Sequence, residues 1–143
     1  MSEAVYLGNP NLKKANVAQE WTKEQIEEYA RCMKDPIYFI RTYIRIVSLD
    51  EGLVPFEMYD FQKEMVGTFH SNRFTICKLP RQSGKSTTII AYLLHYVLFN
   101  PTVNVAILAN KAATARDLLG RLQLAYEHLP KWLQQGVMSW NKG

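Results

Sequence analysis

The residues with the clearest chemical potential lie in the stretch 79–87, LPRQSGKST. An apolar run at residues 74–77 precedes this stretch, and a longer apolar run at residues 88–99 follows it. A strand, a Gly-Lys-Ser turn and a helix in this order are the layout of a phosphate-binding loop. In such a loop, backbone N–H groups at the helix N-terminus contact phosphate oxygens. The sequence therefore predicts phosphate binding at residues 79–87.

The residues of this stretch have distinct roles in such a loop. The ammonium of Lys85 reaches the β- and γ-phosphates of a nucleotide, and the hydroxyl of Ser86 ligates Mg²⁺. Gly84 lies where only a small residue lets the phosphate approach. The usual pattern, G-x-x-x-x-G-K-[ST], has a glycine where this chain has Leu79, so we predict a variant loop. The alternative is an ordinary helix N-terminus with an incidental lysine.

The elements around the loop predict how it is positioned. Residues 74–79 and 103–108 are apolar without clean alternation, which is typical of strands buried on both faces of a parallel sheet. Residues 85–99 between them predict a helix, which ends before Asn100-Pro101. The unit is therefore predicted to be β-α-β, with parallel strands and a right-handed crossover. The predicted fold class is α/β.

A helical segment is predicted ahead of this unit, at residues 21–57. Its first helix begins with Thr22 as N-cap and Gln25 as the reciprocal partner in a capping box. A second helix begins after Asp35, which acts as N-cap, with a proline at the first helical position. This second helix is expected to run to about residue 46, and a connection with a glycine and a proline follows it.

The rest of the chain divides into an extended or flexible arm at residues 1–20 and an incomplete nucleotide-binding domain at residues 58–143. In that domain, helices are predicted at about residues 59–69 and 112–128, followed by an exposed apolar tail at residues 131–140. A nucleotide-binding sheet usually has about five or six strands, and no later strand supplies an acid for Mg²⁺. We therefore expect the front portion of a longer enzyme, without the groups that hydrolysis requires.

Composition limits the class of protein. The length of 143 residues suits one domain with one core. A net charge of +4 and a pI of about 9.1 permit an acidic partner such as nucleic acid without requiring one. Two cysteines, Cys32 and Cys77, make neither a disulfide framework nor a zinc motif. With no secretory leader and no apolar run long enough to span a bilayer, the chain is expected to be intracellular and not secreted.

The motifs resemble those of a known family. Residues 81–86, RQSGKS, look like the deviant phosphate loop of the large terminase subunits, the DNA-packaging motors of tailed bacteriophages. Upstream, residues 59–62, YDFQ, resemble the adenine-recognition motif of that family. Residues 8–16 resemble the stretch ahead of the first helices of that motor, and residues 136–143 are similar to the segment that precedes its next β-hairpin. The resemblance therefore spans nearly the whole chain, and residues 81–86 are its most specific part.

This resemblance implies a partial RecA-like P-loop fold, with ATP and Mg²⁺ as cofactors and double-stranded DNA as the substrate. It also implies a pentameric motor that docks on a portal protein, works with a small terminase subunit and acts in the cytoplasm of the infected bacterial host. The family's acidic magnesium-site strand and its C-terminal nuclease domain have no counterpart in these residues. ATP hydrolysis and nuclease activity are therefore not expected of this chain alone.

The resemblance also assigns residue roles. Arg81 corresponds to an arginine that stabilises transition-state charge in cis, and its alternative is a surface cation beside the phosphate site. Phe61 would pack on the adenine and Gln62 would read its edge; the alternatives are plain helix packing and solvent exposure. Ser86 is the predicted Mg²⁺ ligand. The predicted cofactor-binding residues are Phe61, Gln62, Gln82, Ser83, Gly84, Lys85, Ser86 and Thr87, with backbone donors at 82–84.

Two other functions fit the same residues. A helicase-like nucleic-acid translocase shares the upstream aromatic-Gln pair and the phosphate loop, and it would carry a second motor domain in place of a nuclease. A non-catalytic nucleotide- or DNA-binding module would keep the loop and lack turnover. ATP hydrolysis measured on the chain separates the module from both enzymes.

Overall fold

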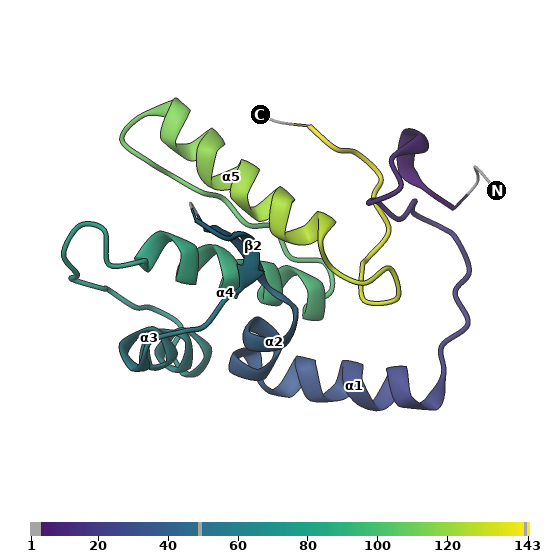
Figure 1. Cartoon of the computed structure of the whole chain (residues 1–143), viewed down its shortest axis with the longest axis horizontal. Coiled ribbons are helices and arrows are strands. Elements are labelled where there is room, and N and C mark those ends of the chain that lie inside the picture. Colours follow the sequence, from purple (N-terminus) through teal and green to yellow (C-terminus); the bar gives the residue numbers. More distant parts are fainter. Residues whose placement is uncertain (1–3, 49, 142) are drawn as a thin grey trace.

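The computed structural model describes residues 4–48, 50–141 and 143. Its elements in chain order are a 3-10 turn η1 (Tyr6–Gly8), α1 (Lys23–Lys34), α2 (Pro36–Tyr43), β1 (Arg45–Ser48), β2 (Gly52–Pro55), α3 (Asp60–Ser71), α4 (Lys85–Phe99) and α5 (Ala112–Glu127). Helix α4 lies in the middle of the molecule and contacts α2, α3 and α5 (Figure 1). The predicted bounds of the helix at residues 85–99 are confirmed.

The first two helices begin where the sequence predicts. The Thr22 hydroxyl accepts a hydrogen bond from the backbone of Gln25 at 3.2 Å, and the Gln25 side chain accepts one from the backbone of Thr22 at 3.1 Å. The Asp35 carboxylate accepts a bond from the backbone of Tyr38 at 2.9 Å, and a proline occupies the first position of α2. Helix α2 ends at Tyr43, earlier than predicted, because the chain then enters a strand.

The strands β1 and β2 form a two-stranded antiparallel hairpin. Their register pairs Arg45 with Pro55 and Ser48 with Gly52. Gly52 has a φ of +74°, a left-handed conformation that glycine adopts readily at the turn of a hairpin. The sequence analysis placed residues 48–57 in a connection, so it missed this hairpin.

The predicted parallel β-α-β core is wrong, and with it the partial RecA-like fold. Residues 74–79 and 103–108 run without secondary structure, and within the described chain no backbone hydrogen bond joins them to each other. Phe74 and Ile76 are 83% and 98% exposed, and Leu108 is 88% exposed. An apolar run is compatible with a buried strand, but a ladder needs a neighbouring strand about 4.8 Å away. The described residues place none between these two segments.

The core forms where the apolar faces of the helices meet. Helix α4 is apolar on nearly all sides, so it can pack against several helices at once. Aromatic rings of Phe39, His95 and Phe99 pack around its second half, with Phe39 and Phe99 edge to face at 5.4 Å. The largest side chains that are fully buried are Phe39, Leu12, Ile40, Ile44, Leu94, Leu133, Val66, Thr88 and Cys32.

The N-terminal arm and the C-terminal tail lie side by side at one end of the molecule, at the right of Figure 1. Val137 donates its N–H to Lys13 at 2.8 Å and accepts a bond from Ala15 at 3.1 Å. Gly136 permits this approach, because a Cβ there would lie 2.4 Å from the Cα of Ala15. The structure thus packs Leu12 of the predicted arm into the core.

One buried side chain secures this contact between the two ends. Gln134 is 3% exposed. It accepts a bond from the backbone of Lys13 at 3.0 Å and donates to the carbonyls of Asn11, Tyr126 and Leu129 at 2.9 to 3.2 Å.

The expectation of an exposed C-terminal tail is therefore wrong for its central residues. Leu133 and Val137 are buried. Trp132 packs edge to face against Trp21 and Tyr43, with ring centroids 6.1 Å apart in both pairs.

Candidate functional site

The predicted phosphate loop forms a tight turn that leads directly into α4. Gln82 and Gly84 both have left-handed backbones, with φ values of +58° and +74°. Right- and left-handed residues in close succession turn backbone N–H groups toward one side, which creates a concave site for an anion. Among the described residues, no side chain caps the N-terminus of α4, so none of them competes for the N–H groups of its first turn. The loop thus has the backbone shape of an anion site.

The ammonium of Lys85 lies across this turn. Its Nζ donates to the carbonyl of Pro80 at 3.0 Å, and the hydroxyl of Ser83 donates to the same carbonyl, also at 3.0 Å. Lys85 is half-buried, as are Ser83, Ser86 and Thr87, whereas Arg81 and Gln82 are exposed. A positive charge is therefore held beside the same turn that gathers the backbone donors, and an entering phosphate could take over the lysine from a neutral carbonyl.

The carbonyl of Gly84 anchors the loop to the rest of the molecule. It accepts bonds from the backbone and the hydroxyl of Thr88, at 3.1 and 2.9 Å. A third donor is Nε2 of Gln62 on α3, at 3.4 Å. Thr88, which is fully buried, had no role in the sequence analysis. The sequence signal for this bond is a threonine in the first turn of a predicted helix, because a threonine hydroxyl there can donate to the backbone carbonyl four residues earlier.

The predicted adenine residues are brought next to the loop by α3. Phe61 stacks on Tyr59, with ring centroids 5.9 Å apart and planes inclined by 11°. Both rings are exposed to solvent. Gln62 is buried, and its Oε1 accepts the backbone N–H of Tyr59 at 2.8 Å. Tyr59 belongs to the motif noted in the sequence, but its stacking on Phe61 was not foreseen.

Mg²⁺ has one predicted ligand at this site, the hydroxyl of Ser86. In the described part of the chain, no group of three or more His, Cys, Asp or Glu side chains is arranged to hold a metal ion. A magnesium ion in a phosphate site takes most of its ligands from the phosphates and water. The residues present therefore fit a nucleotide-borne Mg²⁺ and not a dedicated protein cage.

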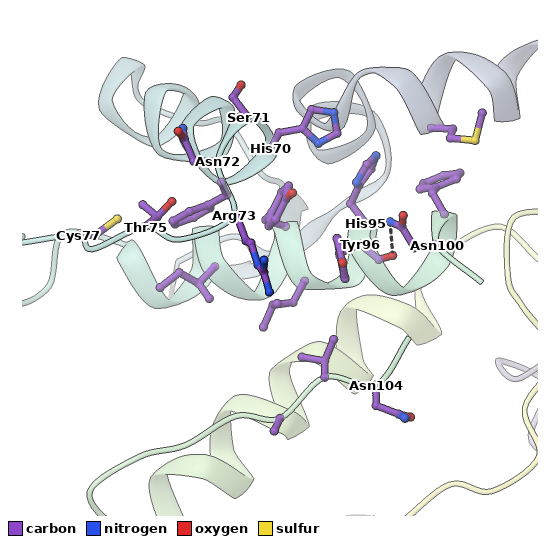
Figure 2. A pocket seen from close by; sticks show the side chains of 18 residues that line it. His70, Ser71, Asn72, Arg73, Thr75, Cys77, His95, Tyr96, Asn100 and Asn104 are labelled. Atoms are coloured by element: carbon purple, nitrogen blue, oxygen red, sulfur yellow. Dashed lines mark hydrogen bonds between the residues drawn. The ribbon is translucent and has the colours of Figure 1, made fainter. Parts of the chain in front are cut away.

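A pocket of about 1080 Å³ lies away from the loop, against the middle of α4 (Figure 2). His70 at the end of α3 and His95 on α4 line it together, with ring centroids 6.1 Å apart. The segments 72–77 and 104–106 form other parts of its wall. None of the predicted site residues lines it. The pocket occupies the gap between the two segments that were predicted to be neighbouring parts of a sheet.

Two polar atoms in the wall of this pocket have no hydrogen-bond partner among the described residues, Oγ1 of Thr75 and Nδ1 of His95. The other ring nitrogen of His95, Nε2, donates to the carbonyl of Cys32 at 2.8 Å. Burial lowers the pKa of His95 below its usual 6.5, although the bond to Cys32 opposes that shift. His95 is thus held as a neutral imidazole near pH 7.

Comparison with models of known protein families gives no match to this chain. Across the described residues, none of the helices combines the length and the apolar character that crossing a membrane requires.

Proposed function

We propose that the chain binds ATP with Mg²⁺ through residues 80–87, and that it is the ATP-binding part of a large terminase subunit. Such a subunit couples ATP hydrolysis to the packaging of double-stranded viral DNA. The observation that carries the proposal is the conformation of the loop. Two left-handed residues, an uncapped helix N-terminus and the ammonium of Lys85 lie together at one turn.

The proposed roles of the loop residues come from the sequence motif, and the geometry of the turn is compatible with them. Lys85 would bind the β- and γ-phosphates, and the backbone N–H groups of residues 82–84 would bind phosphate oxygens. Ser86 would ligate the Mg²⁺ that accompanies the nucleotide, an ion that neutralises phosphate charge. Arg81 is exposed at the rim of the turn, where it is free to approach a bound γ-phosphate. The stacked rings of Tyr59 and Phe61 offer a face for the base.

The wider biological setting rests on the resemblance of residues 59–62 and 81–86. It comprises double-stranded DNA as substrate, a portal protein and a small terminase subunit as partners, a pentameric assembly and the cytoplasm of the infected host. The net charge of +4 is compatible with a DNA partner.

The first test removes the positive charge at the loop. Lys85→Ala should weaken ATP binding by well over tenfold, since the main cation on the phosphates is lost, and each tenfold corresponds to about 1.4 kcal/mol. Isothermal calorimetry at fixed Mg²⁺ measures this. Lys78→Ala is the matched control, because Lys78 is an exposed lysine that lies just ahead of the loop. Equal ATP affinity in Lys85→Ala and the wild type would refute the proposed site.

Lys85→Ala is also the control for a measurement of ATP hydrolysis by the chain. We expect negligible steady-state hydrolysis by this chain alone, because its sequence shows no counterpart of the acidic strand that completes the Mg²⁺ site in phosphate-loop enzymes. Turnover that disappears in Lys85→Ala would show that an acid already present does that work, with Glu57, Asp60 and Asp117 as the candidates. Tight ATP binding without turnover in any longer form of the protein would favour a non-catalytic binding module.

A further inference from the structure

We propose that Gln62 is a positioning residue for the phosphate loop: through Gly84, it holds the loop in its anion-binding shape. This inference rests on the proposed function, and it assigns to Gln62 a task other than reading the edge of the base. The task is structural support at the point where the loop becomes helix α4.

The side chain of Gln62 joins two backbones. It is 2% exposed. Its Oε1 accepts the N–H of Tyr59 at 2.8 Å, and its Nε2 donates to the carbonyl of Gly84 at 3.4 Å. A backbone N–H can only donate and a carbonyl can only accept, so these two partners fix the orientation of the amide. The start of α3 is thereby tied to the start of α4.

The bond to Gly84 sets the direction of a phosphate donor. Because the peptide bond is planar and trans, a carbonyl that points toward Gln62 makes the N–H of the next residue, Lys85, point away from it. That N–H is one of the free donors at the N-terminus of α4. Gln62 also packs closely on Gly84, since a Cβ at that position would lie 2.6 Å from Nε2.

The side chain of Gln62 has few hydrogen-bonding groups left to contact a nucleotide base. Its carbonyl oxygen and one amide hydrogen are committed to the protein backbone, and the side chain is buried. The stacked pair of Tyr59 and Phe61 is exposed instead. Stacking on aromatic rings is tolerant of the base, because every base has a π-face. The geometry therefore gives base contact to the aromatic pair and loop support to Gln62.

The test uses a ligand that has phosphates and no base. Calorimetry with magnesium tripolyphosphate, ATP and GTP compares the wild type with Gln62→Met, a neutral variant of similar length. We expect all three ligands to bind about three- to tenfold more weakly, by a common factor, since about one hydrogen bond to the loop is lost.

Gln25→Met is the matched control for helix capping. Gln25 makes the same reciprocal bond at the start of α1, where its side chain accepts the N–H of Thr22 at 3.1 Å. It is part of α1, which does not carry the phosphate loop. This variant should lose a cap and keep the wild-type affinity for tripolyphosphate.

A second variant keeps the test decisive if Gln62→Met does not fold. Gln62→Glu retains an oxygen for the N–H of Tyr59, removes the donor to Gly84 and adds a carboxylate charge. It should weaken tripolyphosphate binding at least as much, because its carboxylate also repels phosphate.

The outcomes separate the two proposals. Unchanged tripolyphosphate affinity in folded Gln62 variants, with a loss of ATP preference over GTP alone, would overturn the positioning role and assign base reading to Gln62. Unchanged tripolyphosphate affinity in Lys85→Ala would overturn the phosphate site itself. Weaker tripolyphosphate binding by Lys85→Ala and Gln62→Met, with unchanged binding by Gln25→Met, supports both the phosphate site and the positioning role of Gln62.

Discussion

Gly84→Ala is the substitution whose cost the structure determines most directly. Gly84 has φ +74° and ψ 12°, and a left-handed backbone costs an L-residue about 1–2 kcal/mol. The new Cβ would also lie 2.6 Å from Nε2 of Gln62, so that side chain must move. Its two hydrogen bonds, to Tyr59 and Gly84, contribute about 0.5–1.5 kcal/mol each. The expected loss of unfolding free energy is therefore about 2–5 kcal/mol.

Gly52, in the hairpin, provides a control because its backbone has the same φ as Gly84. Gly52 also has φ +74°, but no atom of the described residues lies within 4 Å of where its Cβ would be. Gly52→Ala should therefore cost only the backbone strain of about 1–2 kcal/mol. Replacing glycine by alanine also lowers the conformational entropy of the unfolded chain, which stabilises the folded state. This stabilisation is the same in both variants and cancels in the comparison.

Urea unfolding at equilibrium, followed by circular dichroism, measures both variants. A double-mutant cycle with Gln62→Ala isolates the contact, because without that side chain Gly84→Ala should cost no more than Gly52→Ala. If Gly84→Ala and Gly52→Ala lower the free energy of unfolding equally in the wild-type background, then Gln62 does not pack closely against Gly84, and the reasoning is refuted.

Two further predictions concern the core and the chain ends. Because burial lowers the pKa of His95 in the folded state, the unfolded chain binds its proton more readily. Stability should therefore be full above about pH 6.5 and fall as the pH drops below it. Urea midpoints at pH 7.5 and 5.5 should show this fall. It should be reduced more in His95→Gln than in His70→Gln, because burial lowers the pKa of His95 more than the charge of His70 does; an equal fall in both variants would contradict this. Gln134→Ala should lower the free energy of unfolding by about 2–4 kcal/mol, because it leaves buried backbone groups unpaired. The control Gln123→Ala loses one exposed hydrogen bond and should lower it by under about 1 kcal/mol. Similar losses in the two variants would show that Gln134 does not link the two chain ends.

Local signals in the sequence predicted the helices well. The reciprocal pair of Thr22 and Gln25 and the N-cap at Asp35 depend on residues within three positions of each other, and the structure confirms both. The end of α2 was misplaced because Ile44 and Ile46 suit either a buried helix or a strand. A glycine at position 52 ahead of a short apolar run was the available signal for the hairpin.

Contacts between distant residues could not be predicted in this way. Apolar character at 74–79 and 103–108 indicated strands, but a sheet depends on which segments lie beside them, and the structure shows no such neighbour among the described residues. At the site, the sequence predicted a phosphate loop around Gly84 and Lys85, and the structure shows a tight turn at these residues. The link from Gln62 to Gly84 spans 22 positions, and no local pattern specifies it.

The exposed apolar segment at residues 74–77 has a consequence for how the protein behaves at high concentration. Residues 74–77 combine aromatic, β-branched and small apolar side chains without a proline, a composition that favours intermolecular β-pairing and aggregation. Arg73 and Lys78 flank this segment, and the guanidinium of Arg73 lies 5.1 Å from the ring centre of Phe74. Like charges at both ends keep copies apart in the manner of gatekeeper residues. Salt shortens the reach of that repulsion from about 30 Å at 0.01 M to about 3 Å at 1 M, so the colloidal stability of the protein should decline as ionic strength rises.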